Sequence, residues 1–153
     1  MDIFDVNIYI ETSIRGPEKA KQAAGEWLVE FVTAKGIPVT RRGLIVRDNV
    51  SGNVLPLELL REALSVLTKT CRIQVNTCCK YILGTVQNGR LAEWRKNGWS
   101  RAGGRPLKNK ELWQQVSELM DDHVVKAVCV SHSYRNVMQE DIKKELERIK
   151  KNE

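Results

Sequence analysis

The 153-residue sequence has no long hydrophobic run, no internal repeat and no low-complexity segment. A membrane-spanning helix needs about 20 consecutive apolar residues, and nothing here approaches that length. The first residues, MDIFDVNIYI, begin with acidic residues rather than cations and lack a small-residue cleavage site, so they are not typical of a secretion signal. We therefore expect a soluble, cytoplasmic protein that does not bind membranes.

Cysteine and histidine are also scarce, with four and two copies. The cysteines, at positions 71, 78, 79 and 129, form no C-x-x-C pair and no second cluster. This spacing indicates neither a zinc site nor a disulfide framework. We expect ordinary reduced thiols, mostly buried.

Positive charge is concentrated in one segment. The chain has 25 Lys and Arg against 19 Asp and Glu, and residues 94–113 contain six of the cations, one acid and three of the four tryptophans. The rest of the chain is almost neutral, with 19 cations against 18 acids. Cations neutralise phosphates and indole rings stack on bases or sugars, so the segment predicts nucleic-acid binding. The alternative is a solvated loop whose tryptophans anchor the core.

Hydrophobic periodicity predicts one domain over residues 1–153, with a mixed sheet and helices on its faces. Val6, Ile8 and Ile10 alternate with polar side chains, which is typical of a half-buried strand, and Glu11 follows at its end. Further strands are predicted at 27–33, 39–47, 73–75 and 123–130, and helices at 56–69, 77–89, 90–99, from the N-cap Asn109 onward, and from Gln139 onward.

Three stretches resemble the second half of bacterial type 1 ribonuclease H: TCCKYI at 77–82, EWRKNGWSRAGGRPLKNKELW at 93–113, and HVVKAVCVSH at 123–132. That family has T-D-S-x-Y-V, then W-K-K-x-G-W, a basic protrusion and K-P-V-K-N-x-x-L-W, and a strand leading to a glycine-histidine loop. The resemblance implies an α/β fold with a five-stranded mixed sheet in βββαβα(αα)βα order, flanked by helices on both faces. It also implies a basic protrusion at 94–110.

Members of that family cleave the RNA strand of an RNA/DNA hybrid with two magnesium ions held by four carboxylates. The first carboxylate lies in T-D-G-S, where this chain has I-E-T-S and so Glu11. The second lies in the first turn of a helix, and the alignment places either Pro56 or Glu58 there. At the third, Cys78 stands where the family has aspartate, and a neutral thiol is a poor magnesium ligand.

The fourth family aspartate aligns with Ile142, and Asp141 lies one position away, about 100° around a helix. His132 occupies the place of a family loop histidine associated with proton transfer or product release. The resemblance thus implies an eroded catalytic centre at Glu11, Glu58, Cys78, Asp141 and His132, with no bound metal expected.

Three functions fit this pattern. The first is duplex binding without hydrolysis, of RNA/DNA hybrid, double-stranded RNA or double-stranded DNA. The second is an active nuclease that uses magnesium or manganese at a rearranged site of Glu11, Glu58 and Asp141, with Cys78 as a further ligand. The third is a protein- or ribonucleoprotein-interaction module, like short bacterial relatives linked to mobile elements or ribosomal-RNA processing. In the first, the resemblance assigns nucleic-acid contacts to Trp94, Arg95, Lys96, Trp99, Arg101, Arg105 and Lys108.

Overall fold

The computed structural model describes residues 3–152 and contains a five-stranded mixed sheet with the order β3-β2-β1-β4-β5. The first three strands are antiparallel neighbours, and the last two run parallel to β1. The predicted α/β class, strand number and element order are confirmed. The strands are β1 (Phe4–Thr12), β2 (Lys19–Val32), β3 (Pro38–Ser51), β4 (Cys71–Asn76) and β5 (Val124–Val128).

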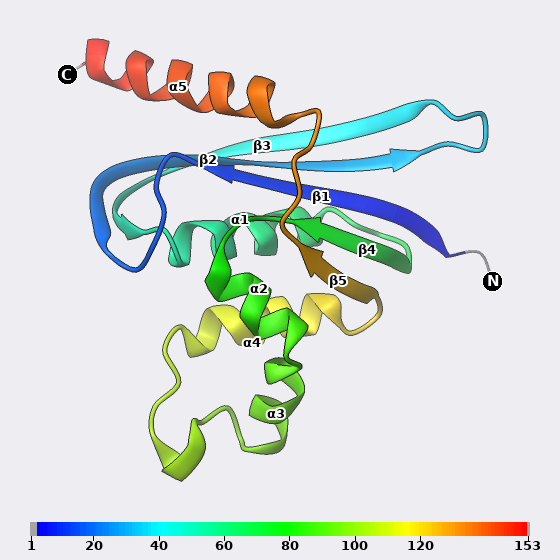
Figure 1. Ribbon diagram of the computed structural model, residues 1–153, viewed down its shortest axis with the longest axis vertical. Coiled ribbons are helices and arrows are strands. Elements are labelled where there is room, and N and C mark those ends of the chain that lie inside the picture. Colours follow the sequence, from blue (N-terminus) through cyan, green and yellow to red (C-terminus); the bar gives the residue numbers. More distant parts are fainter. Residues whose placement is uncertain (1–2, 153) are drawn as a thin grey trace.

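Helices cover both faces of the sheet (Figure 1). One face packs against α1, which contacts β1, β2, β3 and α4, whereas α5 crosses the other face over β1 and β2. A single 3-10 turn, Ala102–Gly104, lies between α3 and α4. The helices are α1 (Val54–Ser65), α2 (Lys80–Gln87), α3 (Arg90–Lys96), α4 (Lys110–Met120) and α5 (Arg135–Lys151).

The alternation in β1 separates two chemically different faces. Val6, Ile8 and Ile10 are buried in the hydrophobic core that α1 and α4 complete. Tyr9 and Glu11 point to the opposite face, because successive side chains of a strand alternate. The face that α5 covers is therefore polar beside β1.

Strand β2 begins at Lys19, eight residues before the predicted start. Its first half contains alanines and polar residues, which have little β propensity, so only tertiary pairing with β3 makes it a strand. Gly25 within it has a packing reason: a Cβ there would lie 2.5 Å from Leu59 Cδ1. The missing side chain lets α1 pack closely on the sheet.

Cys78 and Cys129 form a disulfide, with their Cα atoms 4.7 Å apart. The expectation of reduced, mostly buried thiols is wrong for this pair, since both residues are exposed. The two cysteines follow the parallel strands β4 and β5, where the backbone pairing continues with a hydrogen bond from Thr77 N to Val128 O. Only this pairing brings together residues 51 positions apart. Cys71 and Cys79 remain free thiols.

Over residues 3–152, none of the helices is both long enough and apolar enough to cross a bilayer.

Candidate functional site

An open cleft of about 910 Å³ lies where β1 and β4 end and where α1, α2 and α5 begin. The two strands are parallel, so their carboxyl ends meet at the same edge of the sheet. Segments far apart in sequence therefore share the cleft wall. Its lining comprises residues 10–12, 14–17, 52–53, 56, 77–81, 129–131, 135 and 139.

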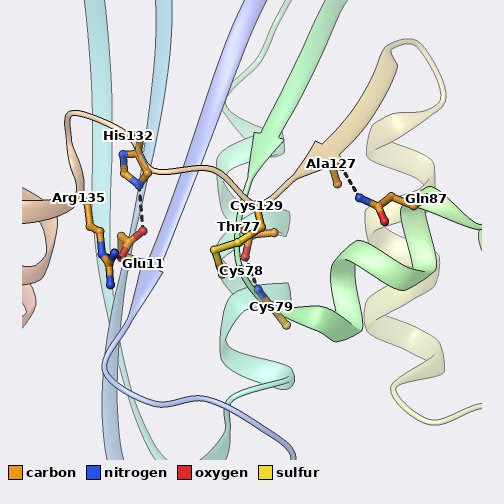
Figure 2. Close-up of a disulfide and its surroundings, with 9 residues drawn as sticks. All are labelled: Glu11, Thr77, Cys78, Cys79, Gln87, Ala127, Cys129, His132 and Arg135. Atoms are coloured by element: carbon orange, nitrogen blue, oxygen red, sulfur yellow. Dashed lines mark hydrogen bonds and ion pairs between the residues drawn. A yellow bond between two sulfur atoms is a disulfide. The ribbon is translucent and has the colours of Figure 1, made fainter.

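Glu11, at the end of β1, is the carboxylate of this cleft (Figure 2). Its Oε2 lies 2.9 Å from His132 Nε2, and its Oε1 accepts a hydrogen bond of 2.8 Å from Gln139 Nε2. The Nε of Arg135 lies 3.9 Å from the same Oε1. Because both of its oxygens are hydrogen-bonded and the side chain is only 14% exposed, the orientation of Glu11 is fixed by α5 and the loop before it.

His132 forms a hydrogen bond with Glu11 but is not one of the residues that line the cleft. Its side chain is 7% exposed, and its ring lies 4.6 Å from that of Tyr9, centroid to centroid. Donation to the Glu11 carboxylate places the proton on Nε2, while the buried Nδ1 has no hydrogen-bond partner among the described residues. His132 therefore positions a carboxylate and lies away from the space a substrate would enter.

Cys78 lies on the cleft wall, bonded to Cys129 in front of the β4 and β5 ends (Figure 2). A disulfide sulfur has neither a negative charge nor a proton to lose, and thiolate is the form that binds metals. Beside it, Lys80 contributes a positive charge to the lining. The bridge therefore provides no ligand for a divalent cation.

Of the two alternatives for α1, Pro56 lines the cleft and Glu58 does not. The first turn of α1 contains no acidic residue. Glu58 instead accepts a hydrogen bond from Arg47 Nε at 3.1 Å, on the side of α1 near β3. A carboxylate at position 58 is therefore neutralised outside the cleft.

In α5, neither Asp141 nor Ile142 reaches Glu11. Ile142 is buried, and Asp141 accepts a hydrogen bond from Arg42 Nη1 at 3.2 Å. Burial, together with the neighbouring Asp141, raises the pKa of Glu26 to about 8. Asp141 thus belongs to a polar cluster with Glu26 of β2 and Arg42 of β3.

Gln139 is the α5 side chain that donates a hydrogen bond to Glu11, and no sequence pattern predicted it. It precedes Asp141 by two positions, roughly 200° around the helix. The sequence contains no direct signal for it, because the distance from His132 to the contact residue depends on how the intervening loop folds. An amide thus lies in the cleft where α5 approaches the end of β1.

These positions do not fit two magnesium or manganese ions. Hard cations need several oxygen ligands around one point, whereas Glu11, Glu58 and Asp141 lie in three separate environments. Across residues 3–152, no group of three or more His, Cys, Asp or Glu side chains is placed to hold a metal ion. The Glu11, Glu58 and Asp141 set does not assemble into one site.

The basic segment, residues 94–110, is anchored at its base. The ring centroids of Trp94 and Trp113 lie 5.7 Å apart. Trp113 Nε1 donates a hydrogen bond to Tyr81 Oη at 2.8 Å. Arg95 pairs with Asp121 and hydrogen-bonds to Ser117, so its guanidinium faces α4. Trp99 is half-buried against the core. The remaining cations with predicted nucleic-acid contacts are exposed: Lys96, Arg101, Arg105 and Lys108.

A family model for RNase H matches residues 5–151. The chain belongs to the ribonuclease H family. Among curated relatives, ribonuclease H of Clostridium botulinum (strain Hall) is 35% identical over 82 residues, which cover 54% of this chain and 55% of that protein. Ribonuclease H of Caldicellulosiruptor saccharolyticus is 30% identical over 102 residues, covering 67% and 68%. The chain thus aligns with about half the length of the first relative.

Solved structures agree on the ribonuclease H fold. The crystal structure of LC9-RNase H1, a type 1 RNase H with the type 2 active-site motif, has a TM-score of 0.68 at 22% identity, covering 85% of this chain and 64% of that one. The foamy viral protease-reverse transcriptase in complex with RNA/DNA hybrid has a TM-score of 0.63 at 18% identity, covering 88% and 19%. At these identities the likeness concerns the fold.

Proposed function

We propose that this ribonuclease H family member binds duplex nucleic acid, with RNA/DNA hybrid as the first ligand to test, and does not hydrolyse it. The main observation against hydrolysis is the Cys78–Cys129 disulfide. Cys78 stands where the family pattern T-D-S-x-Y has its aspartate, between Thr77 and Tyr81. Two-metal hydrolysis requires a carboxylate set that holds both ions, and here a covalent bridge occupies that place.

The other aligned positions support the same conclusion. Pro56 faces the cleft from α1 and Gln139 faces it from α5, and neither side chain is a carboxylate. Glu11 is engaged by His132 and Gln139. Hydrolysis through a rearranged set with Glu58 or Asp141 would require both helices to move, since these carboxylates are paired with arginines elsewhere.

The binding half of the proposal rests on the basic segment. Four exposed cations extend from a base that aromatic packing and the Arg95–Asp121 pair hold to α4. Phosphate neutralisation by such cations gives affinity with little dependence on sequence. The foamy viral relative was solved with RNA/DNA hybrid, which makes this duplex the first choice as a probe.

The disulfide raises the question of the protein's redox state in the cell. We place the protein in the cytoplasm, yet the cytosol keeps most thiols reduced. An exposed bridge such as Cys78–Cys129 is open to attack by thiolates. Both the oxidised and the reduced protein should therefore be assayed.

The test is a titration of labelled hybrid, duplex RNA and duplex DNA at two salt concentrations, with product analysis in magnesium and in manganese. We expect binding that weakens steeply with salt, and intact strands throughout. Replacing Lys96, Arg101, Arg105 and Lys108 with Gln should lower the log-log salt slope by roughly 0.9 per lost contact on B-form DNA. The matched control replaces four exposed cations of α5, namely Lys143, Lys144, Lys150 and Lys151.

Two results would contradict the proposal. If no duplex binds at low salt, the proposed nucleic-acid binding is wrong. Cleavage of the hybrid that disappears in Glu11→Gln shows that hydrolysis survives.

A further inference from the structure

The cleft is positively charged where a metal-dependent site would be negative. Three cations line it, Arg15, Lys80 and Arg135, against the one carboxylate of Glu11. That carboxylate is hydrogen-bonded to His132 and Gln139, and the charge of Arg135 nearby offsets its own. Within the part of the chain that the structure describes, no carboxylate oxygen lies within 4.0 Å of a nitrogen of Arg15 or Lys80. The cleft therefore has cations in excess.

Arg15 is held at the cleft by the packing of its backbone. A Cβ on Gly52 would lie 2.5 Å from Arg15 C and 2.6 Å from Arg15 Cα, so only glycine lets the β1–β2 connection cross the β3–α1 turn here. Ser13 fixes the same connection, because its backbone N donates to Ala24 O at 2.9 Å and its Oγ accepts from Ala24 N at 3.1 Å. The position of Arg15 is thus built into the fold.

Lys80 and Arg135 are the first residues of α2 and α5, at the positive ends of these helices. Cations there are unfavourable for the helix itself, and acidic residues are the usual choice. The three helices that begin at the cleft, α1, α2 and α5, have no acidic residue in the first turn. By contrast, α3 and α4 begin away from the cleft and carry Glu93 and Glu111 there. Among the described α-helices, those that begin at the cleft are therefore the ones whose positive N-terminal end has no first-turn acid to offset it.

We propose that the cleft binds a backbone phosphate of nucleic acid directly, through Arg15, Lys80 and Arg135, without a divalent cation. This deepens the proposed function and rests on it for the identity of the ligand. A cleft lined by carboxylates repels phosphate unless metal ions intervene, whereas this one attracts it. Binding is then independent of magnesium, and the cleft supplies phosphate contacts beyond those of the basic segment.

The first experiment uses inorganic phosphate as the probe, in EDTA. A ligand that binds the folded state raises the melting temperature. Phosphate should raise it more for the wild type than for the triple variant Arg15→Gln, Lys80→Gln, Arg135→Gln, relative to chloride at equal ionic strength. The control variant, with Lys143, Lys144 and Lys150 changed to Gln, loses the same charge from exposed positions on α5 and should match the wild type. Equal phosphate effects in all three proteins would overturn the phosphate site.

The second experiment measures hybrid binding by the same proteins. We expect the wild-type Kd in EDTA to equal that in magnesium at matched ionic strength, and the cleft variant to bind at least ten-fold more weakly with a shallower salt slope. If the wild type binds and the cleft variant binds equally well, the phosphate site is wrong while the proposed function stands. If phosphate discriminates the variants but no duplex binds, the proposed function falls and the site remains a phosphate site.

Discussion

The two faces of the sheet are built from different chemistry. Toward α1 and α4, the sheet presents Ile8, Ile10 and Val75, all buried with the leucines of α1. Toward α5, carboxylates and tyrosines form hydrogen bonds instead, including those of Tyr9 and Tyr134 with Glu30. The side chains that hydrogen-bond or ion-pair with the Glu11 carboxylate, among the described residues, come from α5 or the loop before it.

This difference explains how a ribonuclease H fold tolerates changes at its functional end. The free energy of folding depends mainly on burial of apolar side chains, and these lie on the α1 face. Substitutions among the polar groups under α5 alter charge and hydrogen bonding without opening that core. The following predictions test the contrast, from the largest expected effect to the smallest.

Leu59→Ala should be the most destabilising change. Leu59 is fully buried on α1 and packs over Gly25, so its truncation leaves a cavity and should lower the free energy of unfolding by about 2–5 kcal/mol. On the other face, Tyr134→Phe removes one hydrogen bond and should cost about 0.5–1.5 kcal/mol. Urea unfolding of both variants measures the difference, and equal losses would contradict the contrast between the faces.

The disulfide at the cleft should rank next. It joins residues 51 positions apart, and a bridge of this span stabilises a fold by about 2–4 kcal/mol, chiefly through the unfolded chain. A reductant should therefore lower the unfolding midpoint of the wild type. The double variant Cys78→Ser, Cys129→Ser serves as the control and should no longer respond to reductant. An unresponsive wild type would show that the bridge does not form in solution.

Glu26 should make stability depend on pH on the α5 face. Its pKa is raised from an ordinary value of 4.5 to about 8, by burial first and then by Asp141. The folded state therefore holds a proton that the unfolded state has lost between these values, and stability should fall as pH rises from about 4.5 to 8. The slope is at most about 1.4 kcal/mol per pH unit.

The measurement is urea unfolding of the wild type and Glu26→Gln across that range. The variant has no carboxyl group at this position and should lose the slope. A wild-type stability that rises with pH through this window would show that Glu26 is ionised in the folded protein.

Sequence reasoning could predict the fold because the strongest patterns coincide with the core. The alternation of Val6, Ile8 and Ile10 identified β1 and its buried face, and the leucines after Pro56 identified α1. The first half of β2 was missed since its alanines carry no strand pattern. The start of α5 at Arg135 was also missed, because its first residues show no amphipathic stripe.

The site was less predictable because it depends on loops and on distant pairs. The Cys78–Cys129 bridge needs the β4–β5 register, which no local pattern encodes. Gln139 reaches Glu11 only because of the path taken after His132, which the alignment could not determine. The choice between Pro56 and Glu58 depended on which side of α1 faces the cleft, and the sequence alone does not determine this. Asn109 is at the predicted N-cap of α4, but its side chain makes no capping hydrogen bond.

The aromatic cluster of Trp94, Trp113 and Tyr81 at the base of the basic segment has a further consequence for the proposed duplex binding. A disordered arm would have to surrender its conformational entropy on meeting a duplex, and that loss would weaken the complex. Here the base of the basic segment becomes ordered when the chain itself folds. In the proposed duplex binding, the base of the segment therefore needs no ordering at that step.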